Sequence, residues 1–256
     1  MRNIYPIFKK EVASYFSSPI AYIVITIFLL ISGYLFYSGF AFFSLISLRS
    51  MGNPAILGKL NINEGVIKPL YGNMSIILLL MMPLLTMKLF SEEKKSGTIE
   101  LLLTYPIKDL EAILGKFFAC LLLFFFMLLS TALYPLLLIL FAKPEIGPIL
   151  SIYLGLFLMG TAFISLGILA SSLTENQIIA ATITFGTLFF LFLIGWASSF
   201  VGSSFGKILE HLSIMNHFTN FSKGIIDTKD IIFYINFTIF SLFLTSRSLE
   251  SKKWRG

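Results

Sequence analysis

Residues 117–142 read FFACLLLFFFMLLSTALYPLLLILFA, a stretch without a single charged side chain. A helix needs about 20 apolar residues to cross a hydrocarbon core roughly 30 Å thick, and this stretch exceeds that length. The chain of 256 residues is 57% hydrophobic and 12% charged, with a mean hydropathy of +0.89, so it has too little polar surface to cover a soluble globule. The sequence therefore predicts an all-α integral membrane protein.

Five further apolar stretches bring the prediction to six membrane-spanning helices within one domain, residues 1–256. The predicted spans are residues 20–45, 69–87, 117–142, 149–173, 178–201 and 231–245. Pro83 and Pro135 are expected to kink the second and third spans, because proline removes a helical N–H. The small residues of the fourth span predict close packing inside the bundle, which we favour over a dimer face. They are Ser151, Gly155, Gly160, Gly167 and Ser171.

The chain ahead of the first span predicts an interfacial helix at residues 3–17. Its apolar side chains fall on one helical face and its polar side chains on another, as in a helix that lies along the bilayer surface. Phe8 and Phe16 belong to the apolar set, whereas Lys9 and Lys10, followed by Glu11, are charged. The Ser-Ser-Pro sequence at 17–19 ends this helix, because proline suits the first turn of a new one. The first span is too long for a cleaved signal peptide and is expected to be retained.

The positions of the positive charges predict the orientation of the chain. With the N-terminus inside, 12 of the 19 Lys and Arg residues fall on the inner side of the membrane and the rest on the outer side. We therefore expect both termini and residues 91–108 in the cytoplasm, and a long outer loop at 202–230 with one short surface helix. The apolar face of that helix would comprise Ile208, Leu209, Leu212, Met215 and Phe218. Because the basic residues lie at span ends and not along one face, nucleic acid is not an expected partner.

The polar residues of the chain argue against several chemistries. The predicted spans contain no Asp, Glu, Lys, Arg or His between their ends, which disfavours transport coupled to ions or protons. His211 and His217 are the only histidines, and a spacing of six does not put two metal ligands on one helical face. No histidine reaches the predicted spans, which argues against an intramembrane protease, and the single cysteine, Cys120, excludes an intrachain disulfide. Residues 202–207, GSSFGK, lack the glycine spacing of a phosphate-binding loop. We predict no catalytic, cofactor or metal site, and any ATP would be bound by another chain.

A charged segment, residues 91–108, separates the second and third predicted spans and reads SEEKKSGTIELLLTYPIK. A polar turn at 92–97 is predicted to precede a short helix at 98–103, with Thr98 as its cap, Glu100 near its positive end and Pro106 as its stop. A plain connection between helices needs only about two to eight residues. We therefore expect the segment to dock onto a cytoplasmic partner, with an interfacial helix that has no partner as the alternative.

The same segment carries a resemblance to a known family. Residues 92–107 resemble the region between the second and third spans of ABC-2 type ABC-transporter permeases, where it forms the coupling helix that contacts the ATPase subunit. FKKE at 8–11, together with FSSPIAY at 16–22, is similar to the branch that includes gliding-motility-type and copper-enzyme-maturation permeases. His217-Phe218, KGIID at 223–227 and Asp230 are similar to the same branch. The resemblance extends over nearly the whole chain.

The resemblance implies a permease subunit that forms half of the membrane domain of an ATP-driven exporter in the bacterial cytoplasmic (inner) membrane. It implies two copies of an ABC ATP-binding subunit, which would hold ATP and Mg²⁺, and a second permease half. That half would be the same chain or a related membrane protein with a large extracytoplasmic domain. The residues implied to contact the ATPase are Glu92, Glu93, Lys94, Gly97, Thr98, Glu100, Leu101, Leu102 and Pro106. The alternative function is a membrane scaffold or lipid-interacting protein that recruits a different cytoplasmic partner.

Overall fold

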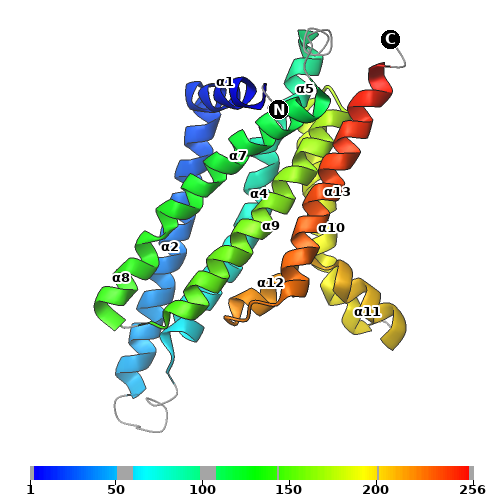
Figure 1. Ribbon diagram of the computed structural model, residues 1–256. Coiled ribbons are helices and arrows are strands. Elements are labelled where there is room, and N and C mark those ends of the chain that lie inside the picture. Colours follow the sequence, from blue (N-terminus) through cyan, green and yellow to red (C-terminus); the bar gives the residue numbers. More distant parts are fainter. Residues whose placement is uncertain (1–2, 51–59, 99–107, 143, 201, 254–256) are drawn as a thin grey trace.

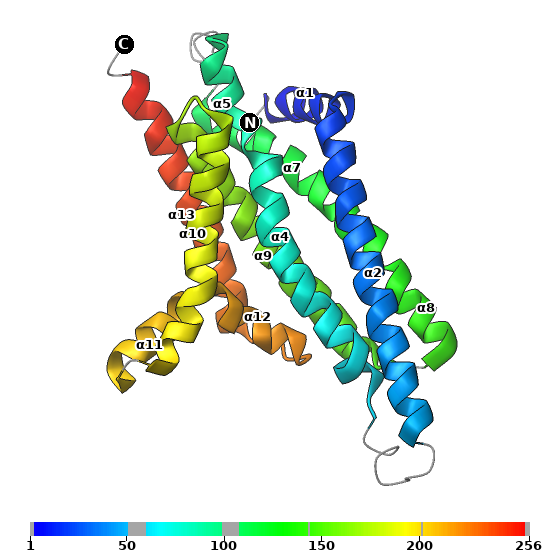
Figure 2. The same ribbon diagram turned by 180° about the vertical axis from the view of Figure 1, so that it is seen from behind.

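The computed structural model describes residues 3–50, 60–98, 108–142, 144–200 and 202–253, and every regular element in these ranges is a helix. Six helical stretches in these ranges are long and apolar enough to cross a membrane, which confirms the predicted all-α membrane fold with six spans. They are Pro19–Arg49, Asn63–Lys95, Asp109–Ala142, Ile146–Leu173, Gln177–Ala197 and Thr228–Ser251. Figures 1 and 2 show them as one elongated bundle with both chain ends at the same end of it.

The first two helices meet at a sharp corner. Helix α1 (Ile4–Ser17) lies across the end of the bundle, and α2 (Pro19–Arg49) runs along it (Figure 1). At the corner, Ser18 caps α2 by accepting the Ile20 N–H at 3.4 Å, and Pro19 takes the first helical position, where its missing N–H costs nothing. The buried side chains of α1 are Ile7, Glu11 and Tyr15, whereas Phe16 is 44% exposed. The side of α1 that faces the protein therefore includes a carboxylate.

The second span continues further than the sequence suggested. It consists of the π-helical turn η2 (Asn63–Ile67), α4 (Lys68–Thr86) and α5 (Lys88–Lys95). The prediction of a polar turn at 92–97 was wrong, because Glu92–Lys95 form the last helical turn of α5. Leu89 and Phe90 are buried, so the side of the helix that faces the protein continues beyond Lys88. The helix therefore does not end at the first charged residue. The turn is limited to Ser96 and Gly97, and Gly97 has a φ of 74°, the left-handed conformation that glycine adopts at helix ends.

The third span has two parts, α7 (Asp109–Thr131) and α8 (Leu133–Ala142). The helix begins at Asp109, ahead of the predicted start at 117. The break lies at Ala132 and not at Pro135 itself. A proline ring clashes with the carbonyl four residues earlier, here that of Thr131, so the distortion appears one turn before the proline.

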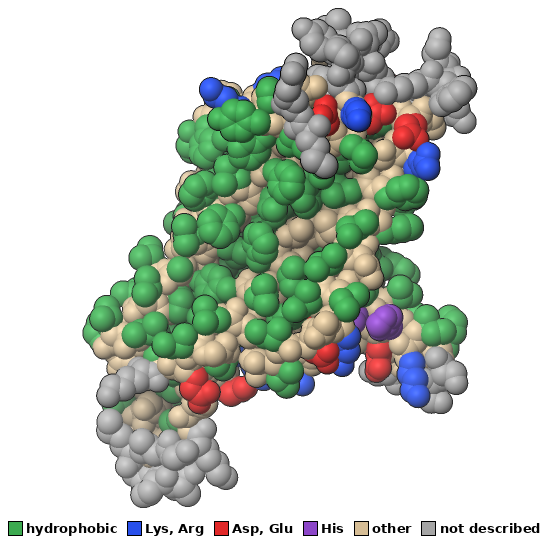
Figure 3. Space-filling model, viewed as in Figure 1, with side chains coloured by type: hydrophobic (Ala, Val, Ile, Leu, Met, Phe, Trp, Pro, Cys, Tyr) green, Lys and Arg blue, Asp and Glu red, His purple; other side chains and the backbone are tan. Residues whose placement is uncertain are grey.

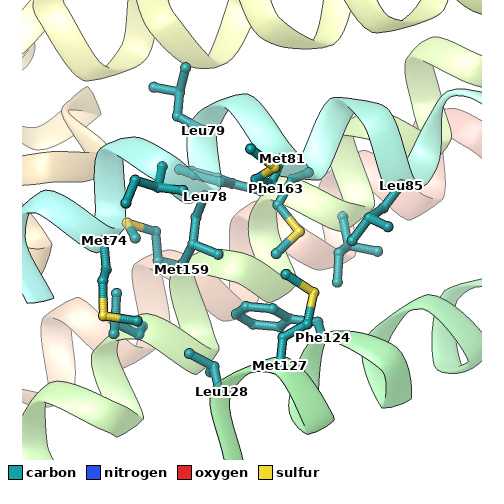
Figure 4. Packing of buried hydrophobic residues seen from close by; sticks show 14 of the residues in the cluster. Met74, Leu78, Leu79, Met81, Leu85, Phe124, Met127, Leu128, Met159 and Phe163 are labelled. Atoms are coloured by element: carbon teal, nitrogen blue, oxygen red, sulfur yellow. The ribbon is translucent and has the colours of Figure 1, made fainter. Parts of the chain in front are cut away.

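Helix α9 (Ile146–Leu173) is the centre of the bundle. It contacts α4, α7, α10 (Gln177–Ala197), α12 (Ile214–Ser222) and α13 (Thr228–Lys253). Its glycines allow this close approach. A Cβ on Gly155 would lie 2.6 Å from the Cβ of Phe221, and a Cβ on Gly167 would lie 2.6 Å from the Cβ of Thr86. These contacts confirm that the small residues pack within the bundle. Figure 4 shows the resulting core, in which Met74 and Leu78 of α4, Phe124 of α7 and Met159 of α9 meet.

The predicted outer loop at 202–230 holds two helices where one was expected. After the short 3-10 turn η3 (Ser198–Phe200), α11 (Ser203–Leu212) leads away from the bundle, and α12 (Ile214–Ser222) returns to pack on α9 and α13 (Thr228–Lys253) (Figure 1). The expected single apolar face is divided at Ser213, which caps α12 by accepting the Asn216 N–H at 3.3 Å. The last helix starts at Thr228, ahead of the predicted 231, so Asp230 lies inside it.

Side chains on the surface follow the membrane pattern. Figure 3 shows hydrophobic side chains over the middle of the bundle and charged ones toward its two ends. Helices α2 and α10 expose many apolar side chains, among them Leu30, Phe42, Phe190 and Trp196. An apolar band bounded by charges is what a bilayer requires of a multi-pass protein.

Candidate functional site

The end of the bundle that carries α1 and both chain termini also carries the charged connection between α5 and α7. Helix α5 is fixed there by one serine of α9. The N–H groups of Phe90 and Ser91 donate to Ser171 Oγ at 2.9 and 3.0 Å, and the Ser171 hydroxyl donates to the carbonyl of Met87 at 2.8 Å. This hydroxyl thus hydrogen-bonds to backbone N–H and C=O groups where the two helices meet. A side chain that inserts into the backbone ladder in this way interrupts a helix, and α4 and α5 are separate helices that join at Met87.

Lys94 attaches the other end of α5 to α9. Its side chain is buried, with 6% of its surface exposed, and its Nζ donates to the carbonyl of Ser172 near the end of α9. The hydroxyl of Ser248 in α13 donates to the same carbonyl at 3.4 Å. A lysine suits this position, because the carbonyls at the end of a helix carry partial negative charge. In this structure Lys94 therefore holds helices together inside the bundle, away from the surface that a partner would reach.

A buried group of charges joins α1, α5 and α7. Lys116 of α7 has only 1% of its side chain exposed, and its Nζ lies 2.8 Å from Glu11 Oε1 and 3.0 Å from Glu93 Oε1. Glu11 and Glu93 have 11% and 14% of their side chains exposed. Exposed Lys10 adds a fourth charge at 3.3 Å from Glu93 Oε1. We call Lys116, Glu11 and Glu93 the charge cluster.

Further contacts set α1 against the ends of the spans. The Tyr15 hydroxyl donates to the carbonyl of Leu85 at 2.9 Å, and the Lys88 Nζ lies 4.9 Å from the centre of the Tyr15 ring. Ile7 fits against Gly115 of α7, where a Cβ would lie 2.9 Å from the Cβ of Ile7. Helix α1 is therefore packed on both α4–α5 and α7, and it covers the buried charges from the end of the bundle.

A polar cavity of about 230 Å³ opens beside the charge cluster. Helix α1 lines it with Lys10, Glu11 and Ser14, α5 and the turn after it with Lys88, Leu89, Glu92, Glu93, Ser96 and Thr98, and α7 with Lys116. Glu93 Oε2 is buried and has no hydrogen-bond partner among the residues that the structure describes. The wall of the cavity therefore contains a buried carboxylate, one oxygen of which binds Lys116 and Lys10.

The predicted contact residues have different environments. Glu92 and Thr98 are exposed, Gly97 forms the turn, and Glu93 and Lys94 are largely covered by the bundle. Glu100, Leu101, Leu102 and Pro106, with the predicted helix at 98–103, lie outside the described residues except for Thr98. In α1, Lys9 and Lys10 are exposed, Phe8 is half-buried, and Glu11 is buried against Lys116.

Reasoning from the sequence misses two residues that organise this end of the bundle. The charge of Lys116 indicates only the inner side of the membrane, although its position between Gly115 and Phe117, at the start of an apolar run, is a signal of burial. Ser171 was noted only as a small residue. No pattern marks it as the acceptor for α5, because the two segments are about 80 residues apart in the chain.

Comparison with known proteins adds one finding. A family model for ABC-2 family transporter proteins matches residues 5–253. None of the curated proteins compared with the chain matches it. The matched range contains α1 from its second residue, all six candidate spans and the charge cluster.

Proposed function

Because the chain belongs to the ABC-2 family of transporter proteins, we propose that it is the membrane-spanning permease subunit of an ATP-driven exporter. The family match confirms the predicted resemblance to ABC-2 permeases, whereas the gliding-motility-type branch stays a prediction. In this proposal a separate ATP-binding subunit, present in two copies, binds ATP and Mg²⁺. A second permease half, either the same chain or a related membrane protein, completes the membrane domain.

The charge cluster is the observation that best supports a response of this chain to ATP hydrolysis in another subunit. Glu93 lies one turn before the charged connection and Lys116 lies two turns after α7 begins, so the cluster joins the two helices that the connection links. Glu11 adds α1 to the same unit. A force on residues 96–108 would therefore move α5, α7 and α1 together, as a rigid element that transmits displacement into the membrane.

The contacts of α5 extend this path to the centre of the bundle. Ser171 and the Ser172 carbonyl both belong to α9, and they accept hydrogen bonds from the two ends of α5. Helix α9 in turn contacts α4, α7, α10, α12 and α13. Displacement of α5 would thus reach nearly all of the spans through one central helix. The chain needs no catalytic residue for this role, since the difference in free energy between its states would come from nucleotide binding in the partner.

The exposed part of this end suits a protein partner. Glu92, Thr98 and Lys10 are exposed and line the polar cavity. In our proposal, Glu100, Leu101 and Leu102 complete the contact with the ATP-binding subunit, charged groups setting the orientation and leucines filling a groove. In our proposal this end and both termini lie in the cytoplasm, on the argument from positive charges, and the membrane is the bacterial inner membrane that the resemblance implies.

The decisive experiment changes the connection and measures ATP turnover by the partner. The double variant Glu100→Lys with Leu102→Ala is reconstituted with the ATP-binding subunit in lipid vesicles. We expect normal insertion but loss of the stimulation that the permease gives to ATP hydrolysis. A matched control is Glu210→Lys with Leu212→Ala, which makes the same changes at the same spacing in α11, where both residues are exposed.

The two variants separate coupling from general damage. The proposal requires that the α11 control keep full stimulation while the connection variant loses it. Equal stimulation in the connection variant and the unchanged protein would refute the coupling role. If pull-downs from native membranes never recover an ATP-binding cassette subunit, the alternative of a scaffold that recruits another cytoplasmic partner takes its place.

A further inference from the structure

Helix α12 belongs to the core at the end of the bundle opposite α1 (Figures 1 and 2). Ile214, Phe218 and Phe221 are 1% exposed or less, and Phe221 fills the space left by Gly155 of α9. The fourth buried side chain of this helix is His217, which is 5% exposed. A histidine in such a position requires hydrogen-bond partners for both of its ring nitrogens.

Both nitrogens of His217 have an acceptor oxygen within reach. Nδ1 lies 2.6 Å from Oδ1 of Asp230, whose side chain is 1% exposed, and Nε2 lies 3.0 Å from the backbone carbonyl of His211. The other carboxylate oxygen of Asp230 accepts a hydrogen bond from Asn220 Nδ2 at 2.7 Å. The ring of Phe233 stacks on the imidazole, with 3.9 Å between ring centres and 19° between planes. The imidazole is therefore held in place on both edges and on one face.

The number of protons on the pair decides whether both contacts are hydrogen bonds. A carbonyl oxygen only accepts hydrogen bonds, so the contact with His211 is a hydrogen bond only when Nε2 carries a hydrogen. A neutral imidazole has one N–H, and with that hydrogen on Nε2 the lone pair of Nδ1 would face a carboxylate oxygen at 2.6 Å. Such a contact is repulsive unless a further proton lies between the two atoms. Both contacts are hydrogen bonds only when the pair holds one proton more than a neutral imidazole beside a carboxylate, and the net charge of the pair is then zero, which suits a buried site.

We propose that His217 and Asp230 form a proton-binding site, with the bound proton on Nδ1, that fastens α12 to α13. The ligand of this site is the proton itself. When it is bound, the imidazolium donates to Asp230 and to the His211 carbonyl, and it links α12, α13 and the end of α11. Release of the proton to water leaves a net charge of −1 in a buried site and removes one of the two hydrogen bonds, so α12 loosens from α13.

The neighbouring groups do not supply a substitute for the proton. Helices α9 and α10 carry no Asp, Glu, Lys, Arg or His, and the one tyrosine of α9, Tyr153, bonds to Tyr71 of α4. Lys68 of α4 pairs with Glu64, and Lys229 of α13 pairs with Asp227 at the surface, at 3.0 Å. Tyr234 of α13 donates its hydroxyl to the carbonyl of Ile214 at 2.8 Å. On α11 and the loop, the ring of His211 lies 5.5 Å from that of His217, and Glu210 and Lys223 form no ion pair with the site among the described residues.

The proton can be observed directly in the full-length protein. Because the chain has only two histidines, ¹⁵N-histidine labelling gives two imidazoles, and the variant His211→Gln assigns them while it keeps the backbone carbonyl that accepts from His217. At pH 7.5 an ordinary exposed imidazole, with a pKa of about 6.5, is roughly 90% neutral. We expect both nitrogens of His217 to show the chemical shifts of N–H groups at this pH. A ring with one bare nitrogen would overturn the proposal.

A second measurement tests the fastening of α12. Asp230→Asn removes the carboxylate that stabilises the proton, and Asp227→Asn makes the same change three residues earlier, where the side chain is 38% exposed and pairs with Lys229 outside the site. We expect hydrogen exchange of the α12 amides to accelerate at least tenfold in Asp230→Asn and to stay unchanged in Asp227→Asn. Equal exchange in the two variants would refute the link between proton and helix docking. If Asp230→Asn does not fold, the spectrum of the unchanged protein still decides whether the proton is present.

Discussion

Removal of the positive charge from the charge cluster tests the physical basis of the proposed coupling unit. In Lys116→Met, an apolar chain of similar length replaces the lysine, so packing is retained while Glu11 and Glu93 lose their common partner. Breaking a buried ion pair by removing one member costs about 3–5 kcal/mol, because the remaining charge is left without compensation. Lys10 still lies 3.3 Å from Glu93, but it is 68% exposed, and an exposed ion pair contributes at most about 1 kcal/mol.

We expect the loss of unfolding free energy in Lys116→Met to lie near the lower limit of about 3–5 kcal/mol. The two carboxylates keep 11% and 14% exposure, so water reaches them to a small extent and Lys10 compensates one of them in part. We expect Lys116→Met to lower the free energy of unfolding by about 3 kcal/mol. For a chain of this length, that corresponds to a decrease in Tm of roughly 6–12 °C. Glu11→Gln added to Lys116→Met is expected to recover at least about 1 kcal/mol, because it removes the charge that was left unpaired.

The chain contains its own reporter for this measurement. Cys120 is the only cysteine and is fully buried, so a thiol-reactive dye labels it only when the bundle opens. Melting curves of detergent-solubilised protein with such a dye give the Tm of each variant. Lys95→Met is the matched control, since Lys95 lies exposed at the end of α5 and its loss is expected to cost less than about 0.5 kcal/mol. Equal Tm values for the two Lys→Met variants would refute the buried charge cluster.

Two further predictions use the same dye assay. Gly167→Ala places a Cβ 2.6 Å from the Cβ of Thr86 and is expected to cost about 1–3 kcal/mol, whereas Gly186→Ala in α10, where a Cβ meets nothing within 4 Å, is expected to stabilise by up to about 1 kcal/mol. An unchanged Tm in Gly167→Ala would show that α4 and α9 are not in close contact there. Ser171→Ala leaves the N–H groups of Phe90 and Ser91 without their acceptor and is expected to cost about 1–3 kcal/mol, against less than about 0.5 kcal/mol for Ser96→Ala at the exposed turn. Equal melting of the two serine variants would contradict the attachment of α5 to α9.

Glu93 and Lys94 show what local reasoning could not decide. The resemblance implied that they contact a partner, and their charge predicted a polar turn after the second span, because charged residues after an apolar span normally mark its end. Both residues lie one helical turn after Leu89 and Phe90, on the same side of α5, and that side is buried, so their side chains are carried inward with it. Whether a charged residue at a helix end faces water or a partner depends on which helices lie next to it. A single sequence does not show which helices are neighbours in the bundle.

The same limit applied at the other end of the bundle. The polarity of residues 202–230 correctly indicated a region outside the long spans, and the apolar face was recognised, but one surface helix was predicted where a buried one follows an exposed one. The spacing of His217 from His211 argues against a metal site, and the resemblance includes His217-Phe218, but neither predicts that the imidazole is buried against Asp230. Its partner, Asp230, was assigned to the loop before the last span, whereas helix α13 begins two residues ahead of it.

The sequence by itself determined that the chain is an all-helical membrane protein with six spans, and it indicated the ABC-2 family through residues 92–107. The free energy of placing a helix in the bilayer is summed over consecutive residues. A run of apolar residues is therefore sufficient to specify a span, whatever the position of the rest of the chain. Only the tertiary structure decided which charges are buried and what they bind. Lys116 meets Glu11 across 105 positions of sequence, and the free energy of a buried charge depends on the distance to its partner in space.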